Sequence, residues 1–123
     1  MVDMRLELVP LPTTDVDRSK AFYVDQVGFV LDHDVEPGNG MRVVQLTPPG
    51  SACSIVIGVG ISDPQGAPVQ GIHLVVDDIE IARRTLTGRG VAVSEVDDMG
   101  GGVRYAYFTD PDGNSWALQE ISR

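Results

Sequence analysis

The sequence feature that most constrains the fold is an internal repeat with a spacing of 63 residues. The acidic run Asp15-Val16-Asp17 matches Asp78-Ile79-Glu80, and Thr47-Pro48-Pro49-Gly50 matches Asp110-Pro111-Asp112-Gly113. The segments between these anchors agree in kind. Two matches at one spacing indicate that the same small module is used twice within 123 residues.

Each half predicts the same order of elements, which is one strand, one helix and three further strands. Asp15 and Asp78 are expected to cap the two helices, because a carboxylate accepts hydrogen bonds from the free N–H groups of the first turn. A glycine then ends each helix, and a Pro-Gly turn joins the last two strands. The predicted strands are 6–11, 29–34, 41–46 and 52–57 in the first half and 72–76, 91–96, 103–108 and 115–121 in the second.

The expected fold class is therefore α+β, with two tandem βαβββ modules. Module one covers residues 1–58, a Gly- and Pro-rich linker covers 59–70, and module two covers 71–123, all within a single domain. A four-stranded sheet with one helix keeps one face uncovered. We expect the two curled mixed sheets to enclose a cavity with these faces, and a ligand to bind there.

Charge and composition exclude several classes of function. The chain carries 18 acidic and 9 basic side chains, for a net charge of −9. This charge argues against binding to nucleic acid or to anionic lipid. No apolar run approaches the ~18 residues needed to span a membrane. The single cysteine, Cys53, cannot form an internal disulfide. These features predict a cytoplasmic protein with no membrane or nucleic-acid partner.

Three segments resemble the vicinal oxygen chelate superfamily, which includes glyoxalase I, extradiol dioxygenases and bleomycin-resistance proteins. They are Thr14-Asp15-Val16-Asp17-Arg18-Ser19 with Phe22-Tyr23, Val76-Asp77-Asp78-Ile79, and Phe108-Thr109-Asp110-Pro111-Asp112-Gly113-Asn114. The resemblance implies a glyoxalase-like fold over essentially the whole chain, and a homodimer. It does not fix the activity, because the superfamily hosts several chemistries on one scaffold.

The resemblance also implies where a divalent metal would bind. Family enzymes hold the metal through His, Gln or Glu side chains on the first and last strands of each module, at positions that correspond here to Leu8, Ser54, Gly71 and Ala117. None of these residues is a good metal ligand. The next inward positions are Pro10, Val56, His73 and Gln119. These offer only one imidazole and one amide, so we expect no metal and no other cofactor.

His73 is the one candidate for a catalytic base, since an imidazole can take up and release a proton near neutral pH. It should face the cavity from the first strand of module two. Alternatively, His73 is a neutral imidazole hydrogen-bonded to Gln119, which would satisfy two buried polar groups. The residues alone leave both interpretations open.

Tyr105 and Tyr107 alternate along one strand and therefore share a face, either lining the ligand pocket or packing beneath the helix. In the fosfomycin-resistance branch of the superfamily, the residue at the position of Tyr107 contacts the ligand. The 63-residue spacing matches Tyr105 with Arg42, Tyr107 with Val44, and Ala117 with Ser54. The predicted ligand pocket consists of His73, Gln119, Tyr105, Tyr107, Arg42 and Ser54.

Three functions follow as hypotheses. The first, which we favour, is a metal-free protein that binds a cationic or aromatic small molecule, similar to the bleomycin-resistance branch. The second is a superfamily enzyme (a glyoxalase-type lyase, an isomerase or a dioxygenase) that uses a divalent metal or His73 as a base. The third is a non-catalytic accessory protein.

The stretch Asp110-Pro111-Asp112-Gly113-Asn114 predicts a tight turn rather than a calcium loop, because it lacks the glutamate that an EF-hand requires.

Overall fold

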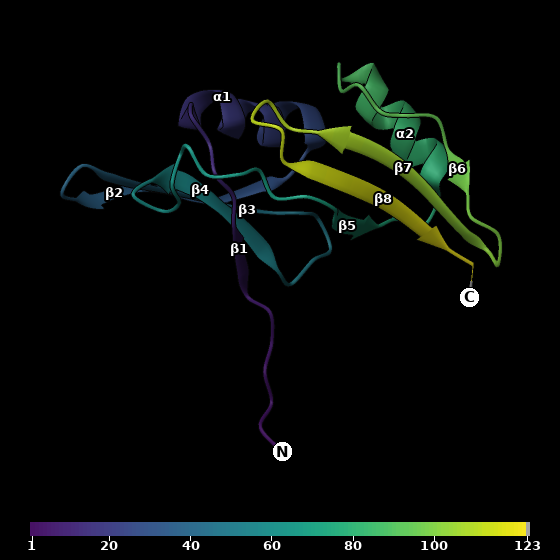
Figure 1. Ribbon diagram of the computed structural model, residues 1–123, viewed down its shortest axis with the longest axis horizontal. Helices are drawn as coiled ribbons and strands as arrows, with labels where there is room; N and C mark the ends of the chain where they lie inside the picture. The colour runs from purple at the N-terminus through teal and green to yellow at the C-terminus, as the bar shows by residue number, and fades with distance from the viewer. Residues whose placement is uncertain (123) are drawn as a thin grey trace. The chain divides into compact units, whose positions relative to one another are not determined.

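A computed structural model describes residues 1–122, and the chain divides into two units, Met1–Ala67 (unit 1) and Pro68–Arg123 (unit 2). Unit 1 contains β1 (Leu8–Pro10), α1 (Val16–Ala21), the π-helical segment η1 (Phe22–Val27), β2 (Val30–Gly38), β3 (Met41–Thr47) and β4 (Ser54–Val59). Unit 2 contains β5 (Ile72–Val75), α2 (Ile79–Gly88), β6 (Asp97–Asp98), β7 (Val103–Thr109) and β8 (Ser115–Ile121). Both units therefore have the predicted βαβββ order (Figure 1).

The two four-stranded sheets have the same topology. Their strand orders are β1-β4-β3-β2 in unit 1 and β5-β8-β7-β6 in unit 2. The first pair in each order is parallel and the other pairs are antiparallel, so both sheets are mixed. Helix α1 packs against β4, and α2 packs against β7 and β8. These findings confirm the α+β class with two tandem modules.

The helices begin and end where the sequence predicts. The carboxylate of Asp15 accepts a hydrogen bond from the N–H of Arg18, and the carboxylate of Asp78 accepts hydrogen bonds from the first turn of α2. Gly28 ends η1 with φ 94°, a left-handed conformation that glycine adopts without steric cost. Among residues 1–122, no helix is long and apolar enough to cross a membrane.

Each unit buries its own aromatic cluster. In unit 1, the ring of Tyr23 packs edge-on against Phe22 at 5.2 Å and stacks with Phe29 at 5.4 Å. In unit 2, the ring of Trp116 stacks with Phe108 at 6.1 Å. The other buried apolar residues include Leu11, Val44, Leu46 and Ile57 in unit 1 and Ile79, Leu86, Val91, Ala106 and Leu118 in unit 2.

The prediction of a strand over 91–96 is wrong. The structure has only the two-residue strand β6 in this part of unit 2, and it pairs with β7 at Tyr105 and Arg104. The N–H of Ser94 still donates to the carbonyl of Tyr107, at 2.9 Å. In return, however, the N–H of Tyr107 donates to the Ser94 hydroxyl, at 2.8 Å, and not to a backbone carbonyl. A side chain thus replaces the backbone in the ladder, and the regular strand is lost.

The 63-residue spacing does not hold along the whole repeat. If β4 and β8 are matched at this spacing, the strand registers match Leu8 with His73, because Leu8 pairs with Ser54 and His73 pairs with Ala117. Likewise Tyr105 matches Gln45, since Gln45 pairs with Val56 and Tyr105 with Gln119. The spacing between equivalent residues changes because the segments that connect successive elements differ in length between the two units. Arg42 and Val44 are therefore not the repeat mates of Tyr105 and Tyr107.

The turn between β7 and β8 is held by hydrogen bonds to its two buried residues, Asp110 and Asn114. The Asp110 carboxylate accepts hydrogen bonds from the backbone N–H groups of Asp112 and Asn114 and, at 2.8 Å, from the Asn114 side-chain amide. The Asn114 side-chain carbonyl in turn accepts a hydrogen bond from the N–H of Val69, at 2.9 Å. Asn114 therefore ties the segment before β5 to the turn that starts β8.

Candidate functional site

The two tyrosines of β7 lie on the face of the unit 2 sheet that α2 does not cover. Ala106 and Phe108 alternate with them along the strand and are buried, on the side where Trp116 and Leu118 also pack. The rings of Tyr105 and Tyr107 stack with a centroid distance of 6.0 Å and an interplanar angle of 12°. Tyr107 is 44% exposed, so the outer ring of this pair is accessible.

His73 of β5 and Gln119 of β8, the strand between β5 and β7, join the same face. The imidazole of His73 meets the ring of Tyr105 edge-on, at a centroid distance of 5.6 Å. The side-chain amide of Gln119 donates a hydrogen bond to the Tyr105 hydroxyl, at 3.0 Å. Four of the six predicted pocket residues therefore lie together, with Tyr105 in the middle. We refer to His73, Tyr105, Tyr107 and Gln119 as the aromatic face.

The hydrogen bonds assign a role to each polar atom of the aromatic face. Nδ1 of His73 lies 2.7 Å from the carbonyl of Gly71, which can only accept, so in the neutral imidazole Nδ1 carries the proton and Nε2 is an acceptor. His73 thus bonds the backbone and not Gln119. The Tyr105 hydroxyl accepts from Gln119 and keeps its own proton for donation. The face can therefore both donate to and accept from a ligand.

A pocket of about 390 Å³ opens at one end of the aromatic face. His73, Tyr107 and Ala117 line it, together with Ser94 from the irregular segment beside β7. Its walls are mostly apolar, with a few hydroxyls and one imidazole, which is the usual character of a small-molecule site. The structure thus places Ala117, the predicted family metal position on β8, in the wall of a pocket.

Unit 1 carries a polar cluster at the equivalent positions of its sheet. The buried hydroxyl of Ser54 accepts a hydrogen bond from the amide of Gln45 and lies 2.6 Å from the hydroxyl of Thr47. The Thr47 hydroxyl also donates to the carboxylate of Asp32. Sequence reasoning found only Ser54 here. The signal that could have found Gln45 and Thr47 is strand alternation, since Val44 and Leu46 between them are buried.

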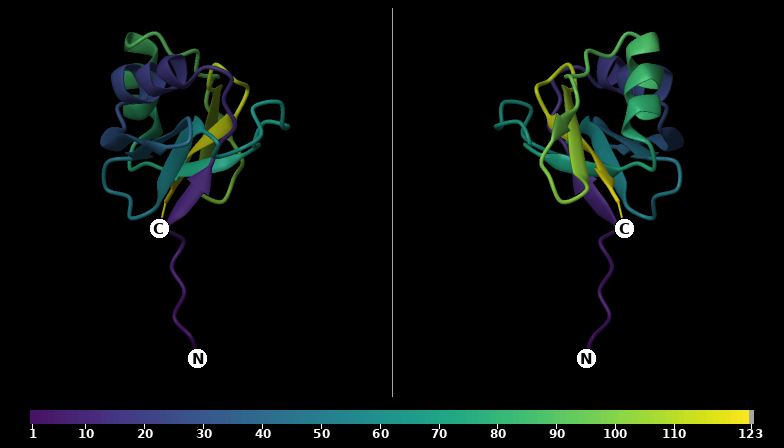
Figure 2. Two further views of the ribbon diagram at one scale, coloured as in Figure 1. Left: turned by 90° about the vertical axis from the view of Figure 1, so that its left-hand side faces the viewer. Right: turned by 90° about the vertical axis from the view of Figure 1, so that its right-hand side faces the viewer.

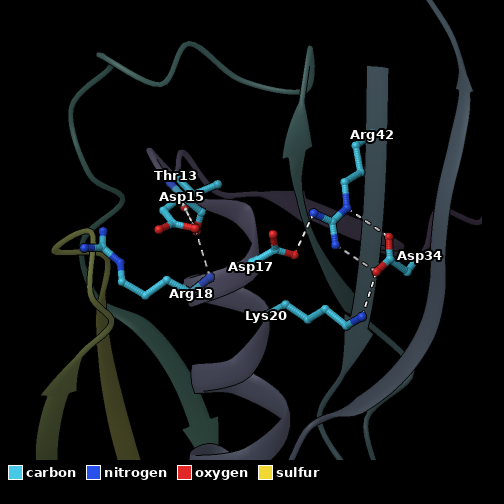
Figure 3. A network of polar contacts seen from close by, with 7 residues as sticks. All are labelled: Thr13, Asp15, Asp17, Arg18, Lys20, Asp34 and Arg42. Atoms are coloured by element: carbon cyan, nitrogen blue, oxygen red, sulfur yellow. Dashed lines mark hydrogen bonds and ion pairs between the residues drawn. The ribbon is translucent and has the colours of Figure 1, made fainter. Parts of the chain in front are cut away.

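Arg42 lies in an ion-pair network that joins α1 to the sheet of unit 1 (Figure 3). Its guanidinium pairs with Asp34 of β2 at 2.9 Å and with Asp17 of α1 at 2.8 Å, and Lys20 also pairs with Asp34, at 2.7 Å. Arg42 shares its strand face with Val44 and Leu46, the face on which α1 packs. The hydrogen bonds from Arg42, and then from Lys20, hold the pKa of Asp34 well below its usual range.

The Asp34→Asn substitution should lower the free energy of unfolding by about 1 kcal/mol at pH 7, because it removes the charge shared by two cations. Since the folded state lowers the pKa of Asp34, this contribution is complete above the unfolded-state pKa and is lost as the pH falls below about 4. Urea unfolding at pH 7 and pH 3 measures the difference. The exposed Asp25→Asn substitution is the control, and a difference that stays constant between the two pH values would contradict this account.

The residues at the family's metal positions do not fit a metal. Leu8 and Ala117 have apolar side chains, Gly71 has none, and the Ser54 hydroxyl is engaged with Gln45 and Thr47. Among the residues that the structure describes, no three His, Cys, Asp or Glu side chains come together as a metal site would require. The donor set of this chain therefore differs from that of the metal-dependent enzymes.

The comparisons with known proteins establish the family. The family model described as "Glyoxalase/Bleomycin resistance protein/Dioxygenase superfamily" matches residues 5–118. The chain belongs to this superfamily, as its two βαβββ units already indicate. A search of curated proteins found no match.

Three solved structures of other proteins are similar to this chain. An antibiotic binding protein from Streptomyces sp. CB03234, TnmS3, is 36% identical, with 99% of each chain covered and a TM-score of 0.85. A glyoxalase/bleomycin resistance protein from the same organism is 37% identical, over 93% of this chain and 98% of that one, with a TM-score of 0.77. A superfamily member from Sphaerobacter thermophilus DSM 20745 is 30% identical, over 96% and 98%, with a TM-score of 0.82.

Proposed function

We propose that this chain binds a small organic molecule without a metal ion, and that the aromatic face of unit 2 is its recognition surface. The observation that carries the proposal is the stacked pair of the half-buried Tyr105 and the exposed Tyr107, on a sheet whose other face carries the buried side chains of Phe108, Trp116 and Leu118. Aromatic side chains left open beside an apolar pocket are a common ligand-binding arrangement. The similarity to an antibiotic binding protein supports the same function.

The chemistry of the aromatic face indicates the class of ligand. Two parallel phenol rings favour a flat aromatic group, which can stack on Tyr107 or enter the pocket beside it. Tyr105 can donate a hydrogen bond, and Nε2 of His73 can accept one. The net charge of −9 favours a cationic ligand over an anionic one. We therefore propose an aromatic molecule, neutral or cationic, that carries hydroxyl or amine groups.

The donor set favours binding over metal-dependent catalysis. A catalytic zinc site normally uses three protein ligands, and the family positions of this chain provide none. His73 remains the one candidate base, and its Nδ1 is held by a backbone carbonyl.

We further propose that the protein acts as a homodimer in the cytoplasm, because two-fold dimers are the commonest oligomers.

The Tyr107→Ala variant should bind its best ligand at least about tenfold more weakly, since truncating an aromatic hot spot costs about 2 kcal/mol or more and about 1.4 kcal/mol already corresponds to tenfold. Titration calorimetry with a panel of aromatic antibiotics, cationic glycopeptides and aromatic metabolites would first identify the ligand and then compare the variants. Tyr107→Phe should retain most of the affinity if stacking dominates. Met99→Ala, which removes an exposed apolar side chain from a turn of unit 2, is the control.

Two outcomes would overturn the proposal. One is that no member of the panel binds, and the other is that Tyr107→Ala and Met99→Ala bind equally well. Binding that disappears on treatment with EDTA and returns with Zn²⁺ or Mn²⁺ would favour the enzyme instead. In that case His73→Ala should abolish glyoxalase or ring-cleavage turnover.

A further inference from the structure

The polar cluster of unit 1 is a continuous line of hydrogen bonds across three adjacent strands. It runs from the amide of Gln45 through the hydroxyls of Ser54 and Thr47 to the carboxylate of Asp32. Figure 2 shows α1 packed on one face of this sheet. The cluster lies on the other face, because the buried Leu46 between Gln45 and Thr47 points toward α1.

A β-bulge brings Asp32 into the polar cluster. The register of β2 against β3 shifts between Leu31 and His33, and His33 takes the place opposite Gln45. Asp32 is the extra residue of the bulge, and its carboxylate accepts the hydrogen bond of the Thr47 hydroxyl. Bulges re-aim a side chain in this way and are frequent beside functional sites. The irregularity of β2 therefore serves to place one carboxylate at the end of the cluster.

The hydrogen bonds of the cluster all point the same way. An ionised carboxylate can only accept, so the Thr47 hydroxyl gives its single proton to Asp32. The Ser54 hydroxyl, which lies 2.6 Å from that of Thr47, must therefore donate to it. Because the proton of Ser54 is used in this bond, Ser54 accepts from the side-chain N–H of Gln45, at 3.3 Å. Every donor in the cluster is thus directed toward Asp32.

The atoms that this arrangement leaves open are acceptors. Among the described residues 1–122, no donor reaches the side-chain carbonyl of Gln45, and no lysine or arginine pairs with the exposed Asp32. Asp34 on the same strand, in contrast, is paired with both Arg42 and Lys20. The polar cluster therefore presents a negative charge for which the described part of the protein supplies no cation.

A protonated primary amine matches these acceptors. It brings a positive charge to the carboxylate and has several N–H groups to donate, to the carboxylate and to the amide carbonyl. Hydrogen bonds with an ionised partner are about twice as strong as neutral ones. An alcohol supplies a donor without the charge, and a quaternary ammonium supplies the charge without a donor. An anion is repelled. The cluster therefore favours a primary ammonium group over each of these alternatives.

We propose that the polar cluster binds the primary ammonium group of a small molecule, and that Asp32 and Gln45 contact this group. Thr47 and the buried Ser54 are positioning residues, since their hydroxyls orient the carboxylate and the amide. The inference goes beyond the proposed stacking of an aromatic ligand and does not depend on it, because the aromatic face belongs to unit 2.

A set of alkyl probes separates charge from hydrogen bonding. The probes are butylamine, butyltrimethylammonium and butanol, added at neutral pH and constant ionic strength and followed by NMR. Butylamine should shift the side-chain NH₂ signals of Gln45 and the backbone N–H signals of Thr47, and should bind at least about threefold more tightly than the other two probes. Equal affinity for butylamine and butyltrimethylammonium, or shifts confined to unit 2, would overturn the proposal.

Removing the charge of Asp32 tests its contact with the amine. Asp32→Asn retains the size of the side chain and should weaken butylamine binding at least about threefold, the effect of losing an exposed ion pair with good geometry. Asp25→Asn is the matched control, because Asp25 is an exposed carboxylate of η1 outside the cluster. The proposal is wrong if both variants bind butylamine as tightly as the native chain.

The positioning role of Thr47 has its own readout. Thr47→Val retains the branched shape but removes the hydroxyl, so the preference for butylamine over butyltrimethylammonium should fall while the charge of Asp32 remains. Thr47→Ser should restore the preference. A preference that survives in Thr47→Val would remove the positioning role. The alkyl probes have no ring to stack on Tyr107, so a failure here leaves the calorimetric test of the aromatic face unaffected.

Discussion

Replacing Asn114 by alanine should lower the free energy of unfolding of unit 2 by about 2–3 kcal/mol, because it removes hydrogen bonds within the folded protein. The Asn114 amide donates to the carboxylate of Asp110, and its carbonyl accepts from the N–H of Val69. Both Asp110 and Asn114 are buried, so water cannot replace these bonds in full. The variant removes the hydrogen bonds that the Asn114 side chain makes with the Asp110 carboxylate and the Val69 N–H.

Trp116 provides the readout for this experiment. It is the single tryptophan of the chain and lies in unit 2, against Phe108, so its fluorescence during urea unfolding follows this unit. Gln65→Ala is the matched control, since it removes the same amide from an exposed linker position and should change the stability by less than about 0.5 kcal/mol. If Asn114→Ala were as stable as the control, the turn would not anchor the segment before β5.

The second large effect is expected for Trp116→Ala, at about 3–5 kcal/mol, the range for removing a large aromatic side chain from a core. Trp116 is 1% exposed, and its ring stacks with Phe108 on the side of the sheet that α2 covers. The surrounding residues lie on a sheet and a helix, which cannot collapse far enough to fill the space. The Trp116→Phe variant retains an aromatic ring and should lose less stability.

The opposite face of the same sheet supplies the control for this prediction. Tyr107→Ala also removes an aromatic ring from unit 2, but from the exposed side, and should cost less than about 1 kcal/mol of stability. Urea unfolding followed by circular dichroism compares the two variants. If Tyr107→Ala and Trp116→Ala lost the same free energy of unfolding, Tyr107 would be part of a packed core and not an accessible ligand-binding side chain.

The fold could be predicted because its signals are local and occur twice. Asp15 and Asp78 begin their helices through hydrogen bonds that depend on residues two or three positions away. The Pro-Gly turns and the alternation of the strands are equally local. The strand expected over 91–96 is the exception. There the hydroxyl of Ser94 takes the place of a backbone carbonyl, a substitution that depends on β7, a strand at some distance in sequence.

The candidate site could be predicted only where strand parity was sufficient. His73, Tyr105, Tyr107 and Gln119 share a face because each lies at the correct parity on its own strand. The repeat predicts Arg42 as the equivalent of Tyr105, and this match is wrong because the spacing between equivalent residues changes from element to element. Constant spacing has no physical basis, because the connections between elements can lengthen without disturbing the sheets. Equivalent residues are instead defined by the backbone hydrogen bonds that set the strand register, and this register is visible only in the structure.

The uneven spacing of the repeat has a consequence for how such a protein can diverge. Insertions in the connections leave the two ladders intact, so each unit keeps its packing while the residues of its open face change freely. Unit 1 now presents an amide and hydroxyls at Gln45, Thr47 and Ser54, whereas unit 2 presents rings at Tyr105 and Tyr107. In a duplicated scaffold of this kind, the fold of each unit can be kept while the side chains that determine ligand specificity change.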